Sequence, residues 1–277
     1  MSSKPKILVT GATSGIGHAT VSAIAALGHP LVVHGRTPEK AEAVAAELRA
    51  SASASVDTVS GDLSDLDSVR ALVTQVTDAH PDLGVLLNNA GTWFTERETS
   101  AQGHERTLAV NHLAPFVLTT GLLPVLRANK ARVVTVASML HERGHMDFDD
   151  LQYERRAFKG MAVYSDSKLA NVLFAAELAR REPDLTSNSL HPGVVKSRLV
   201  HDRSGAGAWF FRNVIQRFFG LSADDGAKTS VHLACSADAA GVSGGYFVKS
   251  KQTPASSEGQ DPAVAKRLWE VTEALVG

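Results

Sequence analysis

The chain has 277 residues, 44% of them hydrophobic and 21% charged, with a net charge of −1. This composition predicts one soluble α/β domain over residues 1–277 and gives no sign of nucleic acid or an anionic membrane as a partner. A polar N-terminus without a signal peptide, the lack of an apolar run long enough to span a membrane, and a single cysteine (Cys235) lead us to expect a cytoplasmic protein. The eleven histidines lack ligand spacing, so we expect no metal site.

The first stretch of the chain reads as strand, glycine-rich turn and helix. An apolar strand over residues 6–10 runs into Gly11-Ala12-Thr13-Ser14-Gly15-Ile16-Gly17, and an alanine-rich helix follows to residue 27. Glycines at such a junction let the backbone approach a ligand, and the helix start favours a phosphate. The spacing G-x-x-x-G-x-G therefore indicates a nucleotide site, although it differs from the commoner G-x-G-x-x-G.

A second strand over residues 31–35 ends at Arg36, where this kind of fold meets the adenosine ribose. An acid there would bind the free 2′-hydroxyl of NAD, whereas a guanidinium suits a 2′-phosphate. We therefore expect NADP(H) as the preferred cofactor, with NAD(H) possible. The alternative is that Arg36 only caps the next helix, over residues 38–50, from outside.

The remaining elements continue the same alternation. We expect strands at 56–60, 84–88, 132–138, 185–190 and 245–248, and helices at 65–80, 104–129, 161–181, 222–237 and 261–275. Asn111 lies inside the helix over 104–129, and exposure on a polar face is its simplest explanation. The pattern predicts a single doubly wound parallel sheet with helices on both faces.

Tyr164 and Lys168 lie four positions apart on the helix over residues 161–181, and therefore one turn apart on one face. A free phenol keeps its proton until a pH of about 10. A neighbouring ammonium would lower that pKa toward the range where proton transfer near neutrality is efficient. The alternative is a surface tyrosine and a solvated lysine that share this spacing by chance.

Seven motifs in the right order make the sequence resemble the short-chain dehydrogenase/reductase family over nearly its whole length. They are Thr10 to Gly17, Gly61-Asp62-Leu63, Asn88-Asn89-Ala90-Gly91, Asn111, Ser138, Tyr164 with Lys168, and His191-Pro192-Gly193. The segments around Asn111, Tyr164 and His191 look like the branch that includes retinol dehydrogenases and protochlorophyllide reductase. The resemblance implies about seven parallel strands, a homodimer or homotetramer, and an apolar alcohol or carbonyl substrate handled with NADP(H).

The resemblance also implies roles for single residues. Tyr164 would be the general acid or base, Lys168 would lower its pKa and bind the nicotinamide ribose, Ser138 would hold the substrate oxygen, and Asn111 would anchor a proton-relaying water. The cofactor-binding set would comprise Gly11, Thr13, Ser14, Gly15, Ile16, Gly17, Arg36, Asp62, Leu63, Asn89, Ala90, Gly91, Tyr164, Lys168, Pro192, Gly193, Val195 and Ser197. Two departures from the family pattern are Ser197, where threonine is usual, and Ala114-Pro115, which can shift the helix locally.

The aromatic-rich segment over residues 198–220 would form a substrate lid, or else a core or subunit-contact helix. Two other functions share parts of this pattern. A non-catalytic dinucleotide-sensing regulator would commonly lose Tyr164 or Lys168, and both are present. A nucleotide-sugar epimerase or dehydratase would tend to have a larger C-terminal region and a G-x-x-G-x-x-G turn, and neither is found.

Overall fold

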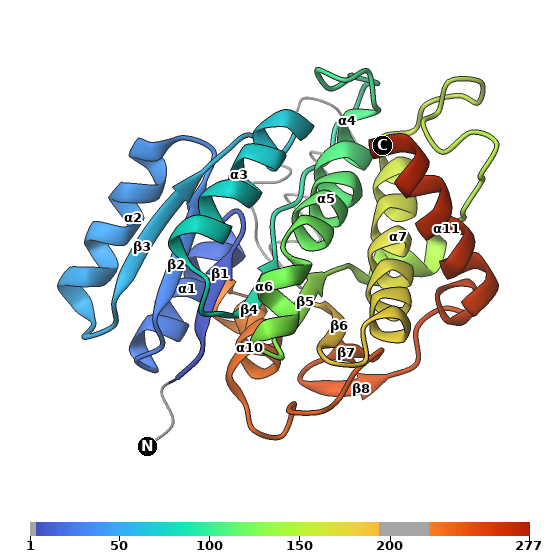
Figure 1. Cartoon of the computed structure of the whole chain (residues 1–277). Helices are drawn as coiled ribbons and strands as arrows, with labels where there is room; N and C mark the ends of the chain where they lie inside the picture. The colour runs from blue at the N-terminus through green and yellow to red at the C-terminus, as the bar shows by residue number, and fades with distance from the viewer. Residues whose placement is uncertain (1–3, 194–221) are drawn as a thin grey trace.

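The sheet of this protein is known from a computed structural model, which describes residues 4–193 and 222–277. Eight strands form one open sheet in the order β3-β2-β1-β4-β5-β6-β7-β8 (Figure 1). The strands are β1 (Lys6–Val9), β2 (Leu31–Gly35), β3 (Val56–Ser60), β4 (Leu83–Asn88), β5 (Arg132–Val136), β6 (Thr186–His191), β7 (Tyr246–Val248) and β8 (Lys251–Thr253). The chain therefore starts at β1, moves outward to β3, and then returns to β4 on the other side of β1. This reversal opens a crevice at the carboxyl ends of β1 and β4, where ligands bind in such sheets.

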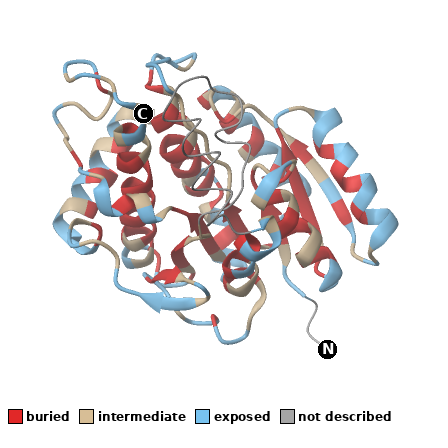
Figure 2. Cartoon of the chain, turned by 180° about the vertical axis from the view of Figure 1, so that it is seen from behind, coloured by how far each residue is buried: buried red, intermediate tan, exposed pale blue. Residues whose placement is uncertain are grey.

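Helices cover both faces of the sheet (Figure 1). One face carries α1 (Gly15–Ala26), α2 (Pro38–Ser51) and α10 (Ala223–Cys235), and the other carries α3 (Leu66–Ala79), α5 (Ala114–Gly121), α6 (Leu123–Ala128) and α7 (Gly160–Arg181), with α11 (Pro262–Val276) against α7. Successive residues of β1 alternate between the two layers, because Ile7 and Val9 pack on one side and Leu8 on the other. Figure 2 shows buried residues concentrated in the strands and on the helix surfaces that face them. The predicted doubly wound fold is confirmed.

The predicted helix over residues 104–129 is wrong in one respect, because it is broken into four parts. These are α4 (Arg106–Leu108), a π-helical turn η1 (Ala109–Leu113), α5 and α6. In the π-helical turn the Ala114 N–H donates to the Ala109 carbonyl, five residues back, and Pro115 then supplies no N–H at all. Asn111 lies in this turn and is fully buried, which excludes the alternative that it is simply exposed on a polar helix face.

Two further differences from the expected elements are small. Each of the seven predicted strands begins and ends within two residues of its expected bounds. An eighth strand, β8, pairs antiparallel with β7 at the sheet edge. All three residues of β8 are exposed and polar, so the sequence has no hydrophobic alternation there that would predict a strand. The proposed lid over residues 198–220 lies outside the described residues. Among the described helices, none has the length and apolarity that crossing a bilayer requires.

Candidate active site

The glycine turn joins β1 to α1 and is held against the end of β4 by hydrogen bonds. The Thr10 hydroxyl accepts from the Asn89 and Ala90 amides at 3.0 Å each, and the Asn89 side chain donates to the Thr10 carbonyl at 2.8 Å. Gly11 and Gly15 have φ of +62° and +54°, which side chains rarely adopt. A Cβ on Gly15 would meet no atom within 4 Å, so space for a ligand is open directly at the start of α1. This arrangement fits the pyrophosphate of a dinucleotide.

Arg36 and Asp62 lie together at the carboxyl ends of β2 and β3. The Arg36 Nε is 4.0 Å from the Asp62 carboxylate, and the Arg36 side chain is 67% exposed. Partial burial opposes the charge on Asp62, but hydrogen bonds from Ser64 and the charge of Arg36 outweigh it and lower its pKa. Leu63, which follows Asp62, is buried in the core cluster. Arg36 thus lies at the end of β2, where the adenosine ribose is predicted to bind, and Thr37 rather than Arg36 occupies the N-cap of α2.

Ser138, Tyr164 and Lys168 are brought together from β5 and α7. Ser138 follows the end of β5 by two residues, and its side chain forms a hydrogen bond with the Tyr164 phenol. The Lys168 ammonium lies 5.7 Å from the centre of the Tyr164 ring and donates to the Val136 carbonyl at 2.9 Å. A Cβ on Gly91 would lie 3.2 Å from this ammonium, so the end of β4 reaches the same point. Three predicted motifs thus converge on one place at the carboxyl edge of the sheet.

The ionisation of this group differs from the sequence-based expectation. Burial raises the pKa of the Tyr164 phenol to about 12, while its hydrogen bond with Ser138 acts in the opposite direction. Burial also lowers the pKa of Lys168 to about 8. The predicted lowering of the Tyr164 pKa by Lys168 is therefore wrong for the ligand-free chain, in which desolvation is the larger effect.

Asn111 holds the segment that follows β4. Its side-chain carbonyl accepts from the Thr92 amide at 2.7 Å, and its amide donates to the Thr92 carbonyl and to the Ser167 hydroxyl, both at 2.9 Å. The side chain therefore connects the β4 loop to α7 directly beside Lys168. Both amide hydrogens are used in these bonds, so a water at Asn111, as the resemblance implies, would have to donate to the second lone pair of the side-chain oxygen or bond to the backbone.

The segment after β6 begins with His191-Pro192-Gly193. Gly193 has a φ of +92°, and its amide donates to the His191 ring at 3.3 Å. This turn follows the strand beside β5 and thus lies next to the Ser138 end of the sheet. Val195 and Ser197, two further members of the predicted cofactor-binding set, lie outside the described residues.

Two residues at the site were not predicted from the sequence. The ring of Trp93 lies 6.5 Å from that of Tyr164, and His34 connects the glycine turn to Gly61 through its side chain. Trp93 belongs to an irregular segment without periodicity, and His34 lies within an otherwise apolar strand, whose pattern indicates burial and no specific contact. Neither position therefore carried a signal that pattern analysis could detect.

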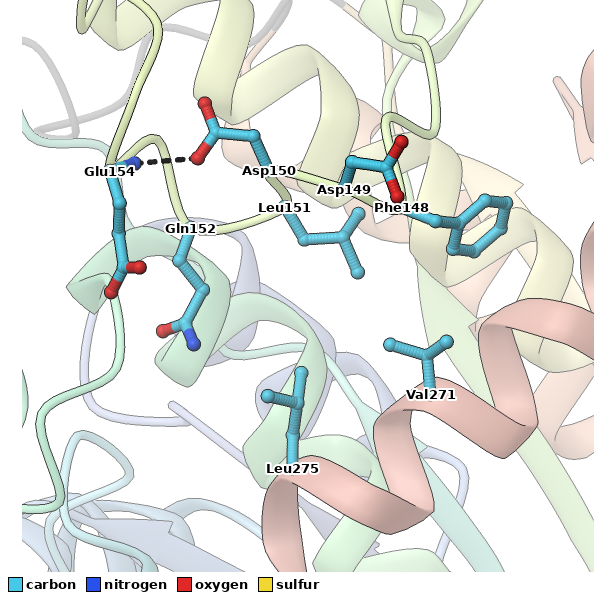
Figure 3. A pocket seen from close by; sticks show the side chains of 8 residues that line it. All are labelled: Phe148, Asp149, Asp150, Leu151, Gln152, Glu154, Val271 and Leu275. Carbon is cyan, nitrogen blue, oxygen red and sulfur yellow. Dashed lines mark hydrogen bonds between the residues drawn. The ribbon is translucent and has the colours of Figure 1, made fainter.

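A separate pocket of about 130 Å³ lies between the loop over residues 148–154 and α11 (Figure 3). It is lined by Phe148, Asp149, Asp150, Leu151, Gln152, Glu154, Val271 and Leu275. None of the predicted site residues is among them. Asp150 also uses its carboxylate to accept backbone amides of the loop itself, including that of Glu154 at 2.7 Å. The pocket is thus distinct from the cluster around Tyr164.

Comparisons with known proteins agree with this geometry. A family model described as short chain dehydrogenase matches residues 5–206. Retinol dehydrogenase 14 of Mus musculus is 38% identical, over 98% of this chain and 85% of that protein, and retinol dehydrogenase 13 of Homo sapiens is 36% identical, over 98% and 84%. A crystal structure of an uncharacterised protein from Mycobacterium Paratuberculosis has 30% identity and a TM-score of 0.80, covering 99% of this chain and 94% of that one. The chain therefore belongs to the short-chain dehydrogenase family of NAD(P)-dependent oxidoreductases and is similar to its retinol dehydrogenase branch.

Proposed function

We propose that the protein interconverts a carbonyl and an alcohol on an apolar substrate, with NADP(H) as cofactor and Tyr164 as general acid or base. The observation that carries this proposal is the meeting of Ser138, Tyr164 and Lys168 beside Gly91, at the edge of the sheet where the glycine turn also lies. A dinucleotide with its pyrophosphate at that turn would lie across the crevice toward these side chains.

A nicotinamide held in this crevice would supply the hydride, or accept it in the oxidative direction. In reduction, Tyr164 gives its proton to the substrate oxygen, and Ser138 donates a hydrogen bond to the same oxygen. Two hydroxyls that converge on one oxygen stabilise the alkoxide-like charge that develops there. Lys168, fixed by the Val136 carbonyl, adds positive charge that favours the phenolate left behind. Its pKa of about 8 leaves the amine mainly charged near pH 7.

Apolar side chains around Tyr164 support an apolar substrate. Met139 directly follows Ser138 and is 45% exposed, and Met161 lies one turn before Tyr164 and is 37% exposed. The Trp93 ring lies beside that of Tyr164, so exposed apolar side chains and an aromatic ring occur close in sequence or in space to the reacting residues. Flexible methionines adapt to substrates of irregular shape. The relatives named retinol dehydrogenases, and one from Streptomyces sp. (strain C5) named for a daunorubicin C-13 ketoreductase, point to the same substrate class.

The preference for NADP(H) rests on Arg36, whose exposed guanidinium is free to turn toward a 2′-phosphate. A structural neighbour from Thermococcus sibiricus, 22% identical with a TM-score of 0.66, is complexed with 5-hydroxy-NADP, and its likeness to this chain supports the fold alone. We also propose a cytoplasmic homodimer or homotetramer, which light scattering of the purified protein tests directly.

Consumption of NADPH with a panel of large and small ketones and aldehydes tests the proposal. We expect turnover that falls by at least about 100-fold in Tyr164→Phe, the scale of a lost general acid. The control is Tyr246→Phe, which removes a phenol outside the predicted site, on β7, where Tyr246 packs against Ala137, Val172 and the ring of His141. Equal rates for Tyr164→Phe and wild type would refute the mechanism. Binding of NADPH without turnover of any compound would instead favour a dinucleotide-sensing regulator.

A further inference from the structure

His34 is a buried histidine in β2 whose two ring nitrogens both contact backbone atoms of the predicted cofactor loops. It is 2% exposed. The Gly11 amide donates to Nδ1 at 3.2 Å, and Nε2 lies 3.1 Å from the Gly61 carbonyl oxygen. Gly11 begins the glycine turn, and Gly61 precedes Asp62 at the adenosine end. One side chain thus joins the two halves of the site.

The partners of His34 determine its tautomer. Because an amide can only donate, Nδ1 must be the unprotonated nitrogen that accepts from Gly11. Because a carbonyl can only accept, Nε2 must carry the proton and donate to Gly61. The imidazole is therefore neutral, in agreement with a pKa that burial lowers to about 4. A second proton at Nδ1 would point at the Gly11 amide and break this contact.

Backbone hydrogen bonds alone do not make the same connection. The Ala12 amide donates to the His34 carbonyl at 3.1 Å, and the Gly61 amide donates to the Gly35 carbonyl at 3.1 Å. These bonds tie each loop to β2 separately. Among the described residues, the imidazole is the side chain that hydrogen-bonds to both loops, and so it links them directly to each other. If the glycine turn and the Gly61 loop already have the spacing of the cofactor-bound state, binding does not require the free energy of ordering them.

We propose that His34 is a positioning residue for the dinucleotide, which holds the phosphate-side turn and the adenosine-side loop at the spacing that the bound cofactor requires. This inference rests on the dinucleotide site of the proposed function. In His34→Ala the Gly11 amide and the Gly61 carbonyl both lose a buried partner, which costs free energy and lets the loops separate. We expect the dissociation constant for NADPH to rise about tenfold.

Equilibrium binding of NADPH and of 2′,5′-ADP, measured by calorimetry with His34→Ala, His34→Asn and a control, tests the inference. The asparagine carbonyl can take the place of Nδ1 and accept from Gly11, so His34→Asn should lie between wild type and His34→Ala. The control is His29→Ala, since His29 is also buried and contacts a backbone carbonyl, that of Pro5 at 3.3 Å, but precedes the opposite end of β2. It should keep the affinity of wild type.

Nitrogen NMR of wild type gives a second readout that does not depend on how well the variants fold. We expect a pyridine-like Nδ1 and a protonated Nε2 for His34, both with and without NADPH. The opposite tautomer would overturn the inference, as would wild-type affinity in a folded His34→Ala or an equal loss in His29→Ala. If wild type binds no dinucleotide at all, the proposed function fails and this inference with it. If wild type binds NADPH and a folded His34→Ala binds it equally well, only this inference fails.

Discussion

Replacing Arg36 with alanine should change the choice between the two cofactors. Arg36 is the one cation that the sequence places at the end of β2, and its Nε lies 4.0 Å from the Asp62 carboxylate. A 2′-phosphate carries a charge between −1 and −2. Removing Arg36 therefore deletes an attraction to the phosphate and also leaves Asp62 to repel it.

The size of this effect follows from the exposure of the side chain. Two unit charges 4 Å apart interact by about 1 kcal/mol in bulk water and by about 4 kcal/mol near a protein surface. Because Arg36 is 67% exposed, we take the lower part of this range, about 1.5–2 kcal/mol. This corresponds to a loss of roughly 10- to 30-fold in NADPH affinity. NADH has no 2′-phosphate, so its affinity should stay nearly constant.

Fluorescence titration of the variant with NADPH and with NADH, at two salt concentrations, measures the effect. The loss should be smaller at high salt, since exposed charges are screened. Arg70→Ala is the matched control, because Arg70 pairs with Asp67 at 3.0 Å on the surface of α3 and lies outside the site. If the ratio of the NADPH and NADH affinities is the same in Arg36→Ala as in wild type, a group other than Arg36 recognises the 2′-phosphate.

Three further predictions concern stability. Gly17→Ala should abolish dinucleotide binding and destabilise the fold, since its Cβ would lie 2.2 Å from the Gly11 carbonyl oxygen. The Cβ of Gly15→Ala would meet no atom within 4 Å, so this variant should lose only about 1–2 kcal/mol of stability, because of its positive φ. Thermal melts of the two variants measure this difference. Lys168, whose pKa falls from 10.5 unfolded to about 8 folded, destabilises the chain below pH 8, and this penalty is relieved as the pH rises to 10.5. The gain in melting temperature of Lys168→Met over wild type should therefore shrink between pH 8 and 10.5, and a constant difference would contradict the assigned shift. Asp166→Asn should lower the unfolding free energy by about 2 kcal/mol, because Asp166 accepts from the Tyr153 hydroxyl at 2.6 Å and from a guanidinium at 3.2 Å. A double-mutant cycle with Tyr153→Phe should show coupling, and strictly additive losses would exclude the contact.

Most of the fold could be predicted because its elements have strong local signals. The apolar strands and the glycines that follow β1 are recognisable from the local sequence. Strands that alternate with helices along a chain are typical of a doubly wound sheet. The broken helix around Asn111 was missed, because a π-helical turn depends on backbone partners one residue farther away and has no distinct periodicity. β8 was missed because it is exposed and polar on both faces.

The amino-acid sequence by itself determined that Tyr164 and Lys168 share one helix face, that glycines open the start of α1, and that a cation rather than an acid follows β2. These are properties of neighbours within one or two turns of chain. Only the tertiary structure decided that burial raises the pKa of Tyr164, that Asn111 is enclosed with every side-chain atom bonded, and that His34 joins two loops. Burial and hydrogen-bond partners come from segments tens of residues apart, and their effect on charge depends on how closely those segments pack.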